Sequence, residues 1–333
     1  MRLKTLRLLI LSGIVGLSVS ACDSGQSSKQ AESQPSEQAA SSAAACDRDC
    51  LKGIVDQFLE AIVAHDASKA PFAATARYTE NGQQLALNDG FWATASSLPD
   101  TRIYAAEPEN GAAVFFGRMT ENGLPVVVAL RLKVENRQIT QAEMFVARQG
   151  ERLYNAEGMT PQPVFEETED PATRSSRQGL IDIANKYFDG IEQATGSFVP
   201  FDDDCIRIEN GEQTVKNASR GTGSADGKFN LSAMGCKEQF NTGFWAYITA
   251  VHPRRYEMVD IERGLVFGVV NFDHAGTVKT IDVPNVGTIN LPPRLLSPYE
   301  SGIGELFKIR NSKILKIEAL VIAAPYKMPS GWE

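Results

Sequence analysis

The sequence predicts an α+β fold that occurs twice along the chain. Three observations support this prediction. Sequence blocks of one half recur in the same order in the other half, each half opens with apolar residues at helical spacing, and each continues into strand-like runs joined by tight turns. Helices followed by a meander of antiparallel strands predict a curved sheet that wraps around a helix.

The internal repeat consists of three blocks. Residues 51–84 align without a gap with residues 180–213, the Gly-Phe-Trp-Ala motif at 90–93 recurs at 243–246, and residues 133–143 recur at 308–318. The offset between the copies grows from 129 to 153 to 175 residues, so the second copy has gained about 24 residues before its Gly-Phe-Trp-Ala motif and about 22 after it. A repeat of this length predicts two tandem domains rather than a solenoid, whose units have roughly 20–50 residues.

The elements of the first copy follow in order. Apolar residues at three- and four-residue spacing predict an amphipathic helix at 51–62, with its counterpart at 180–191. A strand at 76–80, the turn signal Asn81-Gly82 and a short helix opened by Gly90-Phe91-Trp92 come next. The remaining strands are predicted at 103–105, 112–119, 125–134 and 138–148, with a tight turn at 135–137.

The composition is that of a globular protein. The chain has 333 residues, of which 43% are hydrophobic and 22% charged, and this length allows two compact domains. The formal net charge is −8, and removal of residues 1–21, which carry three cations and no acid, leaves −11. So acidic a surface argues against nucleic acid or anionic lipid as the main partner, because both require clustered Lys and Arg.

The N-terminus resembles an export signal. Three cations precede an apolar run at 8–19, which is too short to span a bilayer as a stable anchor. The run ends in Val19-Ser20-Ala21-Cys22, which resembles the lipobox of bacterial lipoproteins, in which Cys22 is acylated once the signal peptide 1–21 is removed. The alternative is an ordinary signal peptide with a chance cysteine.

Residues 22–45 are expected to form a flexible tether. Between Asp23 and Ala45 there is no aromatic residue, Leu, Ile or Val, so little apolar area is available to offset the entropy of ordering. A lipid and a tether hold a folded body beside a membrane, which predicts a periplasmic, lipid-anchored protein. Asp23 resembles the inner-membrane retention signal of enteric bacteria and slightly favours that membrane.

Four cysteines remain if Cys22 is acylated, an even number in an oxidising compartment. They allow three connectivities, and we favour Cys46–Cys50 with Cys205–Cys236 because each pair then lies within one domain. The spacing of Cys46 and Cys50 is not that of a redox Cys-x-x-Cys motif. With only three histidines in the chain, we expect structural disulfides and no metal site.

Three phrases of the first copy resemble a known family. FLEAI…HD in 58–66, RYTENG at 77–82 and ALRLKVENRQIT at 129–140 are similar to SnoaL-like members of the nuclear transport factor superfamily. The resemblance implies two cone-shaped α+β barrels with one open mouth each, at 46–150 and 176–333, joined by a linker at 151–175. Because the superfamily contains isomerases, dehydratases, cyclases and hydrolases as well as modules that only bind, the fold alone implies no reaction.

The resemblance also points to the strand after the helices, where relatives often carry a catalytic carboxylate inside an apolar cone. The position of an isomerase's basic Asp corresponds to Asn81 or Asn210, neither of which can take a proton. Glu80 or Glu209 could substitute, although successive strand residues face opposite sides. The alternative is structural: Glu-Asn-Gly is a turn in which the Asn caps backbone groups and the Gly adopts a positive φ.

Residues present in only one copy are further candidates. Asp273 and His274 follow a predicted strand at 265–270 in the second copy, and such a pair could serve as an oriented general acid/base. A bend would be needed for Asp273 to orient the ring, and the alternative is a histidine on a surface loop. The remaining candidates for substrate contact are Tyr78, Trp92, Arg131, Trp245 and Arg254, with core packing, or a basic turn for Arg254, as their alternatives.

Two hypotheses of function follow. The first is a cofactor-independent lyase, isomerase or hydrolase that acts on a small, largely apolar molecule in the second cone, with His274 or a cavity glutamate moving the proton. The second is a non-catalytic module that binds a ligand or a protein in the periplasm. No G-x-S-x-G, P-loop, Rossmann or H-E-x-x-H motif is present, so we expect no cofactor. We also expect the copies to pair as a pseudo-dimer or the chain to self-associate.

Overall fold

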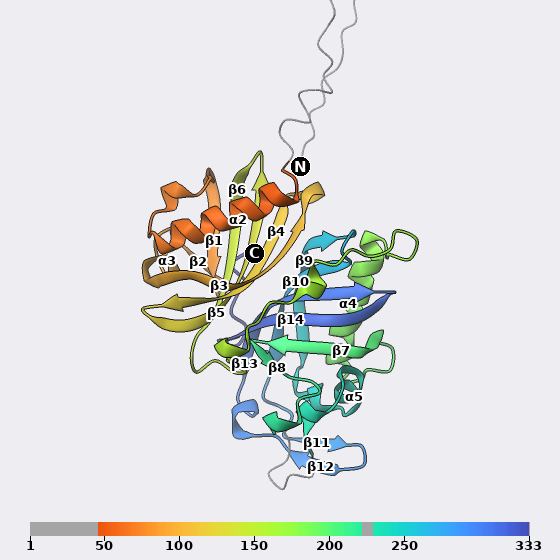
Figure 1. Cartoon of the computed structure of the whole chain (residues 1–333). Coiled ribbons are helices and arrows are strands. Elements are labelled where there is room, and N and C mark those ends of the chain that lie inside the picture. Colours follow the sequence, from red (N-terminus) through yellow and green to blue (C-terminus); the bar gives the residue numbers. More distant parts are fainter. Residues whose placement is uncertain (1–45, 222–228, 333) are drawn as a thin grey trace, which may run out of the picture. The chain divides into compact units, whose positions relative to one another are not determined.

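The computed structural model describes residues 46–221 and 229–332. The predicted signal peptide, Cys22, Asp23 and the tether lie outside the described residues. Two six-stranded sheets dominate the structure (Figure 1), and their strand orders correspond one to one: β2-β1-β6-β5-β4-β3 and β8-β7-β14-β13-β10-β9. The predicted α+β plan of two tandem domains is therefore confirmed.

The first domain runs from α2 to β6. Its elements are α2 (Arg48–Val63), η1 (Ala67–Lys69), β1 (Phe72–Glu80), β2 (Gln83–Leu85), α3 (Phe91–Thr94), β3 (Ala95–Glu107), η2 (Pro108–Asn110), β4 (Ala112–Glu121), β5 (Leu124–Glu135) and β6 (Gln138–Ala147). Two short 3-10 helices, η3 (Ala156–Gly158) and η4 (Pro163–Phe165), lie between the domains in sequence.

The second domain runs from α4 to β14 and contains two insertions. Its repeated elements are α4 (Arg177–Glu192), β7 (Phe201–Glu209), β8 (Glu212–Gln213), η7 (Phe244–Tyr247), β9 (Ala250–Asp260), β10 (Leu265–His274), β13 (Tyr299–Arg310) and β14 (Lys313–Ala324). The insertion before η7 contributes η5 (Ala218–Arg220), η6 (Leu231–Ala233) and α5 (Cys236–Asn241), and the other contributes β11 (Thr280–Val283), β12 (Gly287–Asn290) and η8 (Pro293–Leu295).

The opening helix of each domain begins at a capped residue and packs its apolar stripe on the sheet. The side chain of Asp47 accepts from the backbone N–H of Cys50, and that of Ser176 accepts from Gly179, which satisfies one free N–H of each helix. In Figure 1, α2 lies across one face of the first sheet, and its apolar residues join the buried core of that domain. The capping residues therefore lie where both helices begin, and the apolar residues at helical spacing are the ones that pack on the sheets.

Each sheet is mixed, which corrects the expectation of a purely antiparallel sheet. The strands β3 to β6 form the predicted antiparallel meander, but β1 pairs with β6 in parallel, and β7 pairs with β14 in the same way. No hairpin joins these partners, since most of the domain separates them in sequence. Their relative direction is therefore set by the path of the chain through the domain rather than by a turn.

Both favoured disulfides are present. The Cys46–Cys50 bond lies at the start of α2, with a sequence separation of 4. The Cys205–Cys236 bond joins β7 to α5 with a separation of 31, and so ties the first insertion to the sheet. No helix among the described residues has the length and apolarity required to cross a membrane.

A third buried cluster combines residues of both sheets with the segment between the domains. The rings of Phe116 on β4 and Phe267 on β10 meet edge to face at 6.1 Å, and Phe165 of η4 is fully buried in the same cluster. Two ion pairs flank it: Arg48 of the first domain with Asp260 of the second, and Arg177 of the second with Glu107 of the first.

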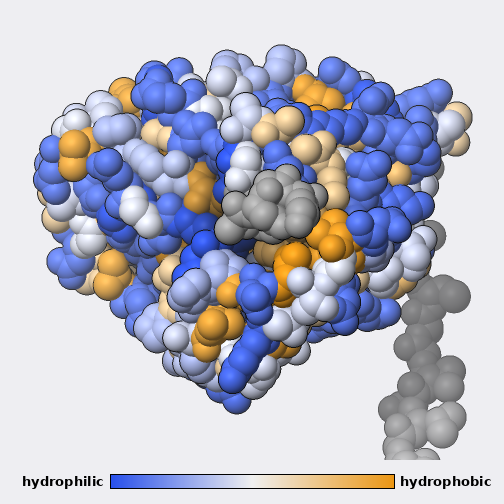
Figure 2. All heavy atoms as spheres, turned by 90° about the horizontal axis from the view of Figure 1, so that it is seen from below, coloured by the Kyte–Doolittle hydropathy of each residue, from blue (hydrophilic) through white to orange (hydrophobic). Residues whose placement is uncertain are grey.

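These ion pairs occupy corresponding positions of the repeat, since Arg48 aligns with Arg177 and Glu107 with Asp260. Reciprocal contacts of this kind are the mark of a two-fold, isologous interface. The copies therefore meet within one chain as a pseudo-dimer. The face seen in Figure 2 is mainly hydrophilic, with apolar atoms in small groups, in keeping with an acidic globular protein.

Candidate functional site

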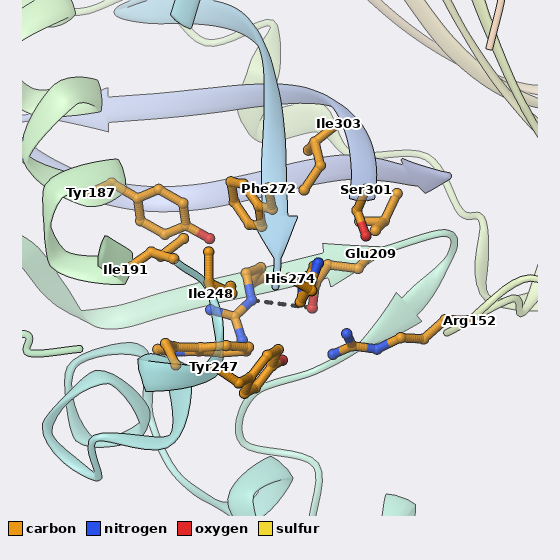
Figure 3. Close-up of a pocket in the computed structure, with 13 residues that line it drawn as sticks. Arg152, Tyr187, Ile191, Glu209, Tyr247, Ile248, Phe272, His274, Ser301 and Ile303 are labelled. Carbon is orange, nitrogen blue, oxygen red and sulfur yellow. Dashed lines mark ion pairs between the residues drawn. The ribbon is translucent and has the colours of Figure 1, made fainter. Parts of the chain in front are cut away.

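The second cone encloses a small cavity (Figure 3) with a volume of about 20 Å³. That volume holds about one water molecule. The cavity is lined by aromatic, aliphatic and ionisable side chains from α4, β7, η7, β10, β13, β14 and the segment between the domains: Arg152, Tyr187, Ile191, Arg207, Glu209, Trp245, Tyr247, Ile248, Phe272, His274, Ser301, Ile303 and Val321.

Arg207 and Glu209 reach the cavity together because alternate residues of β7 face the same side of the sheet. Nε of Arg207 lies 3.3 Å from Glu209 and 3.0 Å from the hydroxyl of Thr214, and the guanidinium lies 5.4 Å from the ring of Trp245. Burial opposes the ionisation of Glu209, but the charges of Arg207 and Arg152 outweigh burial and hold its pKa below the usual value. Glu209 is therefore a carboxylate inside the cone.

The pKa of Glu305 on β13 is shifted in the opposite direction to that of Glu209. Its side chain is 2% exposed, and its backbone lies in the same row of the sheet as Glu209, with Ala319 of β14 between them. Burial and the nearby charge of Glu209 raise the pKa of Glu305 to about 8, although Arg207 and a hydrogen bond with Tyr187 act against that rise. At neutral pH this cone therefore holds one ionised and one protonated carboxyl group.

His274 is 2% exposed and lies between two tyrosine rings. The Tyr299 ring is stacked on it at 4.0 Å and the Tyr247 ring lies at 5.4 Å on the other side. Burial and the charge of Arg152 lower the pKa of His274 to about 4, so the imidazole is neutral at pH 7. Its Nδ1 atom is buried without a hydrogen-bond partner.

Asp273 and His274 do not form the predicted pair. Strand β10 continues through both residues, so their side chains face opposite sides of the sheet, and the expected surface loop is a buried strand instead. A carboxylate oxygen of Asp273 lies 3.2 Å from Nε2 of His252. His274 thus faces the cavity while Asp273 lies behind it.

Arg152 enters the cavity from the segment predicted as a linker. Its guanidinium lies near the hydroxyl groups of Tyr247 and Tyr299, and Figure 3 shows it directed toward the centre of the site. The backbone holds this segment in place, because Nδ2 of Asn210 donates to the carbonyl of Arg152 at 2.7 Å and the N–H of Asn155 donates to the carbonyl of Asn210 at 2.9 Å.

The Glu-Asn-Gly motif is a turn in both copies, with Asn81 and Asn210 at φ values of 48° and 51°. The Oδ1 of Asn81 accepts from the N–H of Val146 at 2.8 Å, and that of Asn210 accepts from Val321 at 2.8 Å. Both amides also donate to the carbonyls of the same valines. The structure thus places both asparagines on backbone groups of the neighbouring strand rather than on the cavity.

In the first domain the corresponding cone is filled with aromatic rings. Trp92 is fully buried and lies 5.2 Å from Phe58, 5.9 Å from Phe72 and 6.4 Å from Tyr78. Glu80 accepts from the N–H of Phe91 at 2.7 Å and pairs with Arg148 at 2.9 Å. The structure places Tyr78, Trp92 and Glu80 together, in the core of that domain.

Two predicted arginines do not line the cavity. Arg131 pairs with Glu143 at 3.1 Å, and Glu143 also accepts from Arg255 of the second domain, which places this network between the sheets. Arg254 belongs to β9 rather than to a turn, and its guanidinium pairs with Asp189 at 2.6 Å and with Glu192 of α4 at 2.7 Å. Its charge is therefore already balanced by the helix.

Sequence reasoning missed Arg152, Tyr187, Tyr247 and Glu305. A position-by-position comparison of the two copies contains a signal for two of them, because Tyr187 aligns with Phe58 and Glu305 with Leu130. When ionisable groups replace apolar ones in only one copy of a repeat, they indicate which of the two domains carries the candidate site. No group of three or more His, Cys, Asp or Glu suited to a metal occurs among the described residues.

Comparisons with known proteins agree with the duplicated architecture. A family model described as a domain of unknown function, DUF8021, matches residues 44–146 and 173–321. No curated protein matches the chain.

Three solved structures are similar to parts of the chain. A protein of unknown function with a cystatin-like fold from Methylobium petroleophilum PM1 is 11% identical, covers 31% of this chain and 80% of its own, and has a TM-score of 0.27. An NTF2-like protein from Cytophaga hutchinsonii ATCC 33406 is 10% identical, with coverages of 29% and 88% and a TM-score of 0.24. A proposed polyketide cyclase from Xanthomonas campestris pv. campestris is 15% identical, with coverages of 29% and 90% and a TM-score of 0.25.

Proposed function

The chain belongs to the family described as a domain of unknown function, DUF8021, and we propose that its second domain is a cofactor-independent lyase, isomerase or hydrolase. Its substrate is a small organic molecule bound in the second cone. One observation carries this proposal: Glu209 and Glu305 share the cone, and their surroundings move their pKa values in opposite directions. Such a pair supplies a base and an acid at the same pH.

The roles follow from the contacts. Glu209 lines the cavity as a carboxylate and takes a proton from the substrate. Tyr187 also lines the cavity next to Glu305, and when its oxygen accepts from the protonated Glu305 its hydroxyl donates to the oxyanion that develops. Glu305, protonated behind Tyr187, passes its proton through the Tyr187 hydroxyl to the oxyanion; Glu209 then releases the proton it has taken to solvent, and Glu305 takes one back. The aliphatic residues Ile191 and Ile303 form an apolar wall around the reacting atoms.

The small volume of the cavity bears on both hypotheses. A space of about 20 Å³ excludes organic molecules unless the residues that close the cone move apart. Arg152 and Tyr247 lie on irregular segments rather than on strands of the sheet, so their displacement would not break a ladder. Substrate turnover and ligand binding in this cone therefore both require that this closure opens.

We also propose that the chain is exported and attached to a bacterial membrane through Cys22. The disulfides of both domains support an oxidising compartment.

A proton-exchange and turnover screen tests the enzyme proposal. The purified protein is incubated with a metabolite extract in deuterated water, and mass spectrometry records products and deuterium incorporation. Glu209→Gln should lower the rate at least 100-fold, because it removes the base. The matched control is Glu80→Gln, at the same position of the other copy, which should retain full activity. Equal rates in both variants, or metabolites that bind without any change, would leave the binding module as the function.

A further inference from the structure

We infer that the second cone takes a carboxylate ligand whose charged group binds Arg152 and whose remainder is small and apolar. The inference rests on the proposed function, because it names the class of ligand for the same cavity. It begins from the surroundings of one side chain. Among the residues that the structure describes, the groups near the guanidinium of Arg152 include the hydroxyls of Tyr247 and Tyr299, and no ion pair joins Arg152 to a carboxylate.

The charge of the cavity is unbalanced. Arg207 pairs with Glu209 at 3.3 Å, and Arg220 lies 3.5 Å from Glu212, so these cations have anionic neighbours. Glu305 is protonated and His274 is neutral at pH 7, which leaves the guanidinium of Arg152 as the excess charge at this site. A buried site with one excess cation favours an anionic ligand.

His274 provides a second, independent observation. Its Nδ1 is buried without a partner on a ring that faces the cavity, and an unsatisfied buried polar atom carries a free-energy cost. An anion beside Arg152 would neutralise the charge that opposes protonation of the imidazole, so that a protonated His274 could donate to the ligand from Nδ1. Binding of the anion is therefore expected to be coupled to proton uptake by His274.

The other groups around the imidazole ring of His274 do not give its Nδ1 atom a hydrogen-bond partner. Tyr247 of η7 and Tyr299 of β13 stack on its faces, and Arg207 and Glu209 of β7 and Tyr187 of α4 line the rest of the cavity. Asp273 and Glu300 belong to the opposite face of the sheet. The charge that lowers the pKa of His274 is that of Arg152.

The walls select the class of anion. The planar guanidinium offers two parallel donors that match a carboxylate. Inorganic phosphate offers a similar oxygen geometry but has no apolar part, whereas Ile191, Ile248 and Val321 line the cavity beyond the arginine. Once the residues that close the cone have moved apart, a short aliphatic or aromatic monocarboxylate satisfies both halves of the site.

The test uses the purified protein and an NMR titration of its histidines, of which the chain has three. Butyrate and benzoate are compared with butyramide and benzamide, which keep the shape without the charge, and with inorganic phosphate. The carboxylates should bind and raise the pKa of His274 above its value of about 4, while the amides should do neither. Amides that bind as tightly as carboxylates, or phosphate that binds as tightly as benzoate, would overturn the inference.

Variants then locate the charge. Arg152→Gln should weaken carboxylate binding at least tenfold and, without ligand, raise the pKa of His274, an effect that a merely structural role would not produce. Arg118→Gln, which changes a partly exposed arginine of the first domain, is the matched control. If Arg152→Gln does not fold, the contrast between carboxylates and amides in the unmodified protein still tests whether binding requires the negative charge of the ligand. Binding without turnover would refute the proposed function alone, whereas turnover of neutral molecules without carboxylate binding would refute this inference alone.

Discussion

The two cones differ in the side chains at corresponding positions of one fold. Phe58, Tyr78 and Leu130 are buried in the first cone, and their counterparts in the second are Tyr187, Arg207 and Glu305. The strand order and the Glu-Asn-Gly turn are nevertheless the same in both. The architecture therefore tolerates ionisable groups in its core, provided that they satisfy one another as Arg207 and Glu209 do.

This difference suggests a division of labour. The first domain keeps an aromatic core and contributes its sheet to the interface. The second domain buries polar groups around a cavity, which lowers its stability. Natural proteins break the rules of core packing at functional sites and compensate elsewhere. The reciprocal ion pairs and the disulfide at the first insertion are the candidates for that compensation.

The largest effect on stability is expected at the interface between the sheets. Glu107→Gln leaves Arg177 without its carboxylate and weakens the bond from Glu107 to the N–H of Val259, so we expect a loss of about 3–5 kcal/mol. Glu109→Gln, two residues away on the surface, is the control and should change little. Urea unfolding measures both. Similar stability of the two variants would argue against an interface held by reciprocal ion pairs.

The two disulfides should differ in their contributions. Closure of the loop between Cys205 and Cys236, with a separation of 31, is expected to stabilise the chain by about 4 kcal/mol, and closure between Cys46 and Cys50, with a separation of 4, by about 2 kcal/mol. Pairwise Cys→Ser variants, compared by calorimetry, give both values. A larger loss on removing the bond of the first domain would reverse the comparison.

The buried carboxyls predict the pH dependence of stability. Burial raises the pKa of Glu305 and of Glu318 to about 8, so their contributions are complete below the unfolded value near 4.5 and are lost as the pH rises to about 8. His274 acts in the opposite direction, because its pKa is lowered to about 4 and its contribution is lost as the pH falls below about 6.5.

The unfolding free energy is expected to fall between about pH 5 and pH 8. In the double variant Glu305→Gln, Glu318→Gln this fall should be smaller by roughly 2 kcal/mol or more. Denaturant unfolding at several pH values measures this profile. Glu157→Gln removes an exposed carboxyl and should retain the original slope. An unchanged slope in the double variant would mean that neither buried carboxyl keeps its proton.

The smallest effect is expected at an exposed ion pair of the first domain. Arg118 pairs with Asp100 and with Glu157 at 2.8 Å, and both carboxylates are largely exposed. Arg118→Gln should cost less than about 1 kcal/mol, and even less at high salt. A loss as large as that of Glu107→Gln would remove the contrast between buried and exposed pairs.

Much of the fold could be predicted because its signals are local or repeated. Apolar spacing locates α2 and α4, the Glu-Asn-Gly turns end β1 and β7, and the repeat itself predicts two domains. The parallel pairing of β1 with β6 has no local signal, since it depends on how distant segments meet.

The site was harder to predict, because it depends on side-chain direction and on distant segments. Glu209 was a candidate from its motif, and His274 from its presence in one copy, but the length of β10 decides which side each residue faces. Arg152 lies outside the repeat, and only the fold brings its segment onto the turn at Asn210. Spacing along the chain therefore identifies candidate residues but does not predict which of them meet in the cavity.

The titration of Glu305 tests the difference between the cones most directly. Carbon-13 NMR of the side-chain carboxyls, with Glu305→Gln to assign the resonance, measures this pKa in the intact protein. We predict a value of about 8 for Glu305, with a carboxyl at Glu209 that remains ionised well below that pH. A value for Glu305 near 4.5, the ordinary one for a glutamate, would show that the second cone holds no acid/base pair.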